Sequence, residues 1–237
     1  MKSSTKVLGS VLLAILLILC VTIVGSRIYL NLKIGNEYIK EGALIMEDPE
    51  TLSYPMKTFN SLDFSGAWEI KITEGSEYAI KVTGPANLLD KVEISQTGKK
   101  LIIKNLNRQN LLKDTFKISL ILPDLEALYI AGGVDMSFDG FSGESLLINL
   151  AGAGRIRGFD SSYENLTLNC TGAGQLDLTD CLSTNAKVNL SGAGEVLLNM
   201  GGGILSGSIS GLGSVEYQGS LRENQIQVSG LGNVNSR

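Results

Sequence analysis

Apolar and polar residues alternate along the second half of the chain, and this alternation predicts β-strands. In one stretch, Leu166, Leu168 and Cys170 are separated by the polar Thr167 and Asn169. A period of two is typical of a strand with one buried face. The same pattern predicts further inward-facing residues at Leu146, Ile148, Leu150, Ile156, Leu176, Leu178, Ala186, Val188, Leu190, Val196, Leu198, Leu205, Ile209, Val215, Tyr217, Ile226, Val228 and Val234.

The alternating stretches recur at a fixed spacing around a glycine-rich tetrapeptide. Its copies read A-G-A-G at 151–154, T-G-A-G at 171–174, S-G-A-G at 191–194, and S-G-L-G at 210–213 and 229–232. The first glycines are separated by 20, 20, 19 and 19 residues, and a degenerate copy, A-G-G-V, lies 20 residues before the first. Six registers at one period indicate a repeat architecture.

A unit of about 20 residues holds two or three short strands and cannot bury its own apolar face, whereas stacked units share one core. The sequence therefore predicts an all-β fold, a β-solenoid similar to a single-stranded β-helix, with coils of about 20 residues. Its phase places the paired glycines on the inward side, where the missing Cβ permits a corner or a close approach of two backbones. These glycines are Gly152, Gly154, Gly172, Gly174, Gly192, Gly194, Gly211, Gly213, Gly230 and Gly232.

Residues 57–125 also contain alternating runs, but they follow no repeat. Two of the runs flank the turn Q-T-G-K at 96–99, which predicts a β-hairpin. We expect this section to start the solenoid and to cover its first open edge, because an uncovered edge recruits other strands. Residues 126–237 then form the repeat solenoid. The expected strands of the first section include residues 68–72, 78–82, 92–94, 101–103 and 116–122.

An uncharged apolar segment, residues 7–25, follows Lys2 and Lys6. At about 1.5 Å per residue it reaches roughly 27 Å as a helix, close to the hydrocarbon thickness of a bilayer. We expect residues 1–27 to form a single transmembrane anchor, residues 28–56 to form a tether, and the C-terminal domain to lie outside the cell. The alternative is a cleaved signal that releases a secreted domain, since residues 24–26 are small enough for cleavage.

Several segments resemble the head GIN domain family of autotransporter adhesins, which are found on bacterial envelopes. The similarity begins with F-N-S-L-D-F-S-G at 59–66 and continues with I-K-I-T-E-G at 70–75, N-L-L-D-K-V at 87–92 and L-P-D-L-E at 122–126. It then follows the S-G-A-G copies, and so covers about residues 57–237. The resemblance implies a β-helix-like fold, exposure at the cell surface and an adhesive role. It supplies no catalytic residue, and the chain departs from a longer autotransporter in having no barrel segment.

Composition narrows the possible chemistry. The chain has 28 glycines and no histidine, which excludes an imidazole general base, a Ser-His-Asp relay and a His-ligated zinc site. The net charge of −4 makes nucleic acid an unsuitable partner. The glycine motifs continue as strands and match neither a dinucleotide fingerprint nor a phosphate loop. We therefore predict no cofactor and no catalytic residue.

Outward-facing polar residues form the candidate binding surface. Asn149, Asn169 and Asn189 fall at the same position of successive repeats. Their amides can hydrogen-bond along the stack, or they can form a flat polar strip that binds a surface glycan or a protein. The other candidates on outward positions are Arg155, Arg157, Gln175 and Glu195.

Metal and disulfide sites find little support in the repeat. Calcium could be held by Asp177 and Asp180, but a metal column would need an acid at one position of every repeat, so we predict no metal. Cys170 falls on the inward phase, between Leu150 and Leu190. Cys181 lies about half a coil away, so a disulfide between the two cysteines is the less favoured interpretation.

These features favour a membrane-anchored surface domain that binds or spaces something at the bacterial envelope and catalyses nothing. One alternative is a polysaccharide lyase, with Arg155 or Arg157 as the base beside Asp177 and Glu195. The other is an envelope-stress sensor that passes a signal through its anchor to a membrane partner. The sequence does not fix the ligand or the oligomeric state.

Overall fold

The computed structural model describes residues 49–55, 58–106 and 116–237, which lie in the compact unit Glu47–Arg237. The predicted transmembrane segment, residues 7–25, and most of the predicted tether lie outside these residues. Within the described ranges, no helix is long and apolar enough to cross a membrane.

The described part of the chain is all-β, apart from one short 3-10 helix, η1 (Ala86–Lys91). The strands are β1 (Pro49–Ser53), β2 (Ser61–Glu74), β3 (Ala79–Pro85), β4 (Val92–Thr97), β5 (Lys100–Asn105), β6 (Lys117–Leu122), β7 (Ala127–Asp139), β8 (Ser142–Phe159), β9 (Ser161–Gly201), β10 (Ile204–Ser220), β11 (Glu223–Val228) and β12 (Asn233–Ser236).

Successive repeats pair with one another in parallel and in register. β7 pairs with β8 and β8 with β9, so that Gly132 lies opposite Gly152 and Gly152 opposite Gly172. β9 pairs with β10 through the slightly shorter repeat that follows, which matches Gly192 with Gly211. The spacing of the tetrapeptides in the sequence is therefore the spacing of the ladder.

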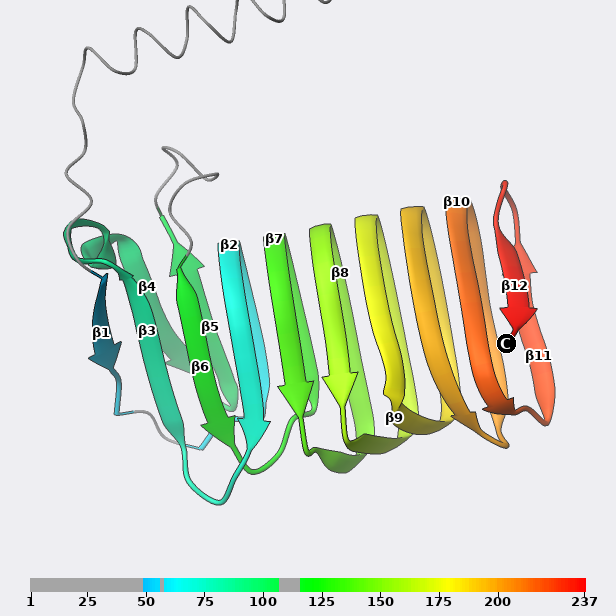
Figure 1. Ribbon diagram of the computed structural model, residues 1–237, viewed down its shortest axis with the longest axis horizontal. Helices are drawn as coiled ribbons and strands as arrows, with labels where there is room; N and C mark the ends of the chain where they lie inside the picture. Colours follow the sequence, from blue (N-terminus) through cyan, green and yellow to red (C-terminus); the bar gives the residue numbers. More distant parts are fainter. Residues whose placement is uncertain (1–48, 56–57, 107–115) are drawn as a thin grey trace, which may run out of the picture. The chain divides into compact units, whose positions relative to one another are not determined.

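Each repeat has two legs, which lie in two layers (Figure 1). β7, β8 and β10 rise in the rear layer, bend at the upper edge and descend in the front layer. The first leg precedes the paired glycines and the second leg follows them. The apolar side chains of both legs meet between the layers, where Leu166, Leu168 and Cys170 are at most 1% exposed.

The predicted inward residues from Leu146 to Val215 are buried, which confirms the alternation as the basis of the core. The last repeat differs. Ile226 and Val234 are only partly buried and Val228 is 44% exposed. These residues lie on β11 and β12, which pair on one side with β10 and form the end of the ladder.

The two glycines of the T-G-A-G copy at 171–174 act differently at the bend. Gly172 has φ +121, and a Cβ there would collide with the carbonyl oxygen of Gly152 in the preceding repeat. A Cβ at Gly174 would instead meet the core side chains of Leu150 and Cys170. In this copy the first glycine lets neighbouring backbones stack closely, and the second leaves room for the core.

The first section closes one side of the ladder. The edge of β2 that does not face β7 pairs in parallel with β5 and β6. β4 and β5 form the predicted antiparallel hairpin, whose turn contains Gly98 with φ +59. β3 pairs antiparallel with β6, and β1 with β3.

Strand β1 was not predicted, since its residues belong to the segment interpreted as a tether. Its pattern is weak because only Leu52, followed by Tyr54 just beyond the strand, packs against the core. Thr51 adds a hydrogen bond to Thr83 of β3 at 2.8 Å between the hydroxyls. The strand forms because β3 offers it an edge, which the local sequence does not reveal.

Candidate functional site

The three predicted asparagines form a hydrogen-bonded column on the first legs. The Asn169 amide Nδ2 donates to Asn149 Oδ1 at 2.7 Å, and Asn189 Nδ2 donates to Asn169 Oδ1 at 2.8 Å. Ser208 extends the column with a bond of 3.4 Å to Asn189. Because each amide is hydrogen-bonded to its neighbour, the column joins the repeats to each other and offers a ligand few free donors or acceptors.

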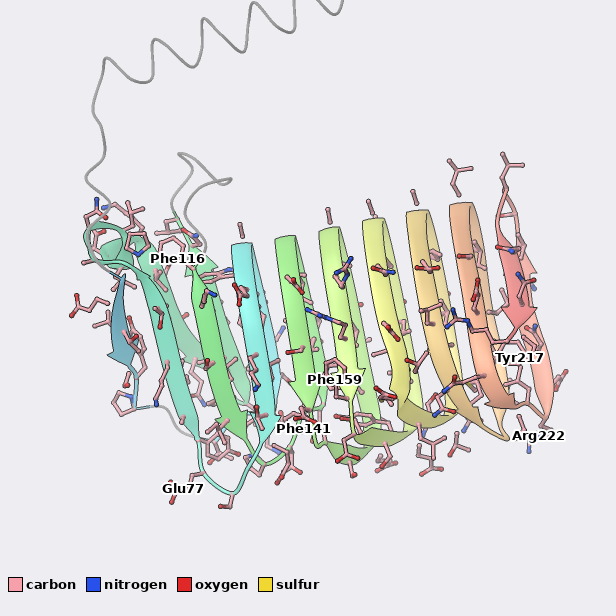
Figure 2. All side chains as sticks on the ribbon, in the orientation of Figure 1. Glu77, Phe116, Phe141, Phe159, Tyr217 and Arg222 are labelled. Carbon is pink, nitrogen blue, oxygen red and sulfur yellow. The ribbon has the colours of Figure 1, made fainter. Side chains whose placement is uncertain are left out.

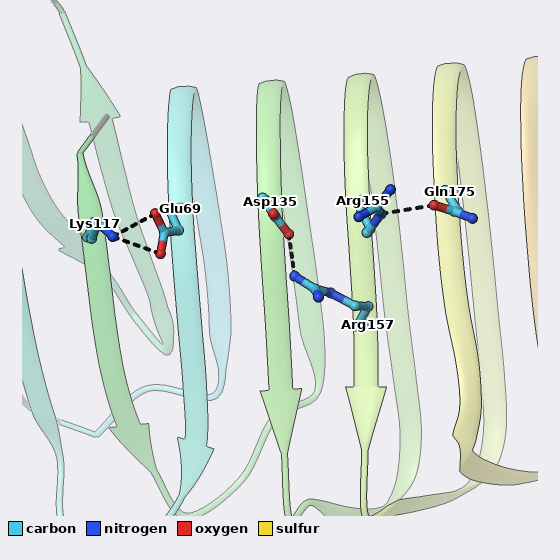
Figure 3. Close-up of polar contacts among 6 residues, drawn as sticks. All are labelled: Glu69, Lys117, Asp135, Arg155, Arg157 and Gln175. Atoms are coloured by element: carbon cyan, nitrogen blue, oxygen red, sulfur yellow. Dashed lines mark hydrogen bonds and ion pairs between the residues drawn. The ribbon is translucent and has the colours of Figure 1, made fainter. Parts of the chain in front are cut away.

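A second polar column runs along the second legs (Figure 3). Arg155 Nε donates to Gln175 Oε1 at 2.9 Å. Gln175 Nε2 in turn donates to Glu195 Oε2 at 2.8 Å. Arg157 turns back to the preceding repeat, where its Nη2 lies 2.7 Å from Asp135 Oδ1. All four predicted residues of this column are thus engaged with other repeats.

Figure 3 also shows Lys117 of β6 bridging to Glu69 of β2, with Nζ and Oε2 3.0 Å apart. Both side chains are about half exposed, so this pair adds little to stability.

The structure does not bring the two groups of predicted residues together. Asn149 lies on the first leg of β8 and Arg155 on its second leg, with the bend at Gly152 between them. The two columns therefore belong to separate faces, and they cannot form one binding surface.

The residues of the lyase alternative are hydrogen-bonded to other groups of the protein. Arg155 and Arg157 are bonded to Gln175 and Asp135, as described above, while the Asp177 carboxylate accepts a bond from the Thr179 hydroxyl at 2.7 Å. A general base needs a free pair of electrons near its substrate, and these guanidinium groups are positively charged donors.

A groove lies at the turns between repeats, away from the two columns. It has a volume of about 700 Å³ and follows the region where β8 ends and β9 begins. Phe159 and Leu182 supply apolar side chains that are 39% and 47% exposed. Its polar lining includes Asp160, Asp180, Thr179, Asn199 and Gln218.

Phe159 interrupts a polar row in this groove. Its partner in β7 is Asp139, and Asn199 and Gln218 are partners further along the ladder. Thr179 occupies the same position as Phe159, one repeat later in the sequence. An exposed aromatic ring in a row of otherwise polar side chains is not needed for the core.

No periodic pattern in the sequence points to this groove. Phe159 and Asp160 fall between alternating runs and outside the glycine motif, so the repeat pattern gives them no role. When the repeats are aligned by their glycines, one aromatic residue stands out in a column of polar residues.

Perturbed acid–base groups lie inside the protein and not in the groove. Burial raises the pKa of the Cys170 thiol and raises the pKa of Cys181 from 9.0 to about 12. Both cysteines are free thiols, and their positions in the core agree with the inward phase predicted for Cys170. The pKa of the Tyr163 hydroxyl is also raised, chiefly by burial, and this hydroxyl donates to the Leu125 carbonyl oxygen at 3.1 Å. In the part of the chain that the structure describes, no three His, Cys, Asp or Glu side chains are grouped so as to hold a metal ion.

Comparison with known protein families gives one match over most of the chain. Residues 58–221 match the family described as "Putative auto-transporter adhesin, head GIN domain". No curated protein sequence matches the chain significantly.

Solved structures from Bacteroides and Parabacteroides species are similar to the chain. A "putative adhesin" from Bacteroides fragilis is 16% identical, with a TM-score of 0.62, over 80% of this chain and 97% of that one. A "putative adhesin" from Parabacteroides merdae is 15% identical, with a TM-score of 0.44, over 80% and 96%. A "putative lipid binding protein" from Parabacteroides distasonis is 18% identical, with a TM-score of 0.43, over 80% and 97%. At 16% identity, the likeness to the Bacteroides fragilis structure concerns the fold alone.

Proposed function

The chain belongs to the head GIN domain family of auto-transporter adhesins, and from this premise we propose that it is a non-catalytic binding module at the bacterial cell surface. Residues 7–25 anchor it in the membrane as a single helix, and the C-terminal domain lies outside the cell. The binding domain is a β-solenoid with one coil for each repeat.

The observation that carries this proposal is the engagement of the outward polar columns with the ladder itself. The asparagine column and the Arg155–Gln175–Glu195 column both connect neighbouring repeats. Side chains held in this way stiffen the domain and are poorly placed to transfer protons. A stiff surface suits a module that presents a contact site at a fixed position.

The in-register pairing supports the solenoid. Each repeat contacts its neighbours through parallel strands, and the apolar residues of successive repeats align in the core. The length and apolar character of residues 7–25 support the anchor. An extracellular position agrees with the role that the family's description gives its members.

Attachment of living cells tests the proposal. Bacteria that display the full chain are compared with the same strain lacking it, on immobilised host cells, matrix proteins and cell-wall polymers. We expect the displayed chain to increase attachment to at least one surface, and an antibody fragment against residues 126–237 to block the increase. Equal attachment of both strains to every surface, with the chain verified on the cell exterior, would contradict the proposal.

A further inference from the structure

We propose that the groove beside Phe159 binds a neutral saccharide. This inference rests on the proposed surface-binding function and names the class of ligand. One shallow groove combines an exposed ring, free carboxylates and a free amide.

The exposed ring provides the apolar half of the site. Phe159 lies at the lower end of β8, in the front layer of the ladder (Figure 2). It is 39% exposed, and Leu182 in the same groove is 47% exposed. The negative face of an aromatic ring attracts polarised C–H groups. The axial C–H groups on one side of a pyranose ring are polarised in this way. A flat ring therefore matches one side of a sugar.

Part of the polar lining is not used by the protein. Within the described residues, the side chains of Asp160, Asp180 and Asn199 make no hydrogen bond or ion pair. An ionised carboxylate only accepts hydrogen bonds, and an amide both donates and accepts. Vicinal sugar hydroxyls supply paired donors and acceptors that match this set.

The charge of the groove selects among saccharides. Its lining contains two aspartates and neither lysine nor arginine. Carboxylates repel uronic acids, sialic acid and sulfated sugars, because like charges placed opposite each other disfavour a complex. The groove is therefore expected to bind neutral sugars and to reject anionic ones.

The turn that carries Asp160 fits this arrangement. Asp160 has φ +41 and is the one non-glycine residue with a positive φ in the described chain, whereas Gly140 has φ +89 at the turn of the preceding repeat. An aspartate at such a turn is less favourable than glycine. Asp160 places a carboxylate in the lining of the groove and directly follows Phe159 in the sequence.

The shallow form of the groove predicts modest affinity for one sugar unit. Deep pockets cover most of a bound ligand, whereas an open groove contacts one side of it. Several copies of the chain on one cell would then strengthen attachment through multivalency.

Glycan binding by the purified full chain tests the inference directly. The probes are oligosaccharides ending in glucose, galactose, mannose or N-acetylhexosamine, together with oligogalacturonate and sialylated glycans. We expect binding to at least one neutral probe and none to the anionic probes. Phe159→Ala should weaken that binding at least tenfold, Asp180→Asn should weaken it several-fold, and Phe159→Tyr should preserve it.

Matched controls separate the groove from general surface effects. Leu212→Ala removes another exposed apolar side chain, 62% exposed and located at the glycine bend, and should leave glycan binding unchanged. Thermal unfolding of each variant checks the fold. If Phe159→Ala fails to fold, the single variants Asp180→Asn and Phe159→Tyr still test the groove. EDTA should also leave binding unchanged, because the carboxylates contact the sugar directly.

Three results would overturn the inference: binding of no neutral probe, binding that Phe159→Ala and Asp180→Asn leave intact, or binding that EDTA abolishes. These results are distinct from failure of the proposed function. If displayed cells attach to a surface but the groove variants attach equally well, the surface-binding role stands and the saccharide site is wrong. If displayed cells attach to nothing, the surface-binding role itself fails.

Discussion

Gly172 holds a backbone conformation that other residues adopt only at a cost. It combines φ +121 with close stacking on the carbonyl group of Gly152. We expect Gly172→Ala to lower the free energy of unfolding by about 2–4 kcal/mol, since strained backbone and a steric clash both contribute. Urea unfolding followed by circular dichroism measures the change.

Gly133→Ala is the matched control for this substitution. Gly133 lies at the bend of β7, has no positive φ, and has open space where a Cβ would be. Alanine there should change the free energy of unfolding by less than about 1 kcal/mol, because the lower entropy of the unfolded chain offsets a small cost in the folded one. Equal losses at Gly133 and Gly172 would contradict the stacking argument.

The buried thiol of Cys181 makes stability depend on alkaline pH. Burial raises its pKa from 9.0 to about 12 in the folded protein, so between these values the unfolded chain loses this proton and the folded chain keeps it. Stability is then fully present below pH 9 and falls as pH rises toward 12, by up to about 1.4 kcal/mol per pH unit for this group.

Cys181→Ala removes this source of pH dependence. Other groups also titrate in this range, so the measured quantity is the difference between the slopes of unfolding free energy against pH from 8 to 11. The unmodified protein should lose stability more steeply than the variant. Parallel slopes would show that the thiol of Cys181 is not protected from ionisation.

At the scale of elements, the asparagine column couples strands through its amides. Asn169 both donates to Asn149 and accepts from Asn189. Asn169→Asp replaces the donor with a second acceptor that faces the Asn149 oxygen, so we expect a loss of about 1–3 kcal/mol in the free energy of unfolding. Urea unfolding at pH 7 checks this value.

Asn235→Asp provides the comparison, because Asn235 is exposed on β12. It should change stability by less than about 0.5 kcal/mol. A similar effect at both positions would mean that added negative charge, and not the lost donor, accounts for the change at Asn169.

The repeat made much of the fold predictable, since one period determines both the strand phase and the pairing register. A further stacked glycine, Gly66, falls outside this period; it lies opposite Gly132 and has φ +110. The β3–β6 section lies between these two glycines in the sequence, so their separation is much longer than one repeat. The S-G-A sequence at 65–67 was a usable signal, but an insertion hides it from a search at fixed spacing.

The candidate site was harder to predict than the fold. The outward phase of Asn149 and Arg155 follows from alternation, but their placement on separate legs depends on the bend at Gly152. The groove depends on turns, where no period applies. Sequence periodicity therefore identifies what repeats, whereas binding residues such as Phe159 are recognised by their departure from the repeat.

At the scale of the whole domain, the two ends of the ladder are built differently. β2 is followed outward by β5 and β6 and then by antiparallel strands, with Phe59 and Phe116 fully buried in that section. At the other end, β11 and β12 have no further strand beside them among the described residues, and Leu231 is 86% exposed. Stability should therefore be distributed unevenly along the ladder.

Hydrogen exchange should reveal this gradient. Backbone amides of β11 and β12 have a ladder partner on one side and little apolar cover, so they open at low free energy. Amides at 166–170 lie between two neighbouring repeats and carry side chains that are nearly fully buried. We expect the strands at 223–236 to exchange at least a hundredfold faster than residues 166–170, as measured by mass spectrometry of peptides. Equal protection of both segments would mean that the end of the ladder is covered in solution, for example by a second copy of the chain, because an isolated edge of this composition cannot retain its amide protons to the same degree.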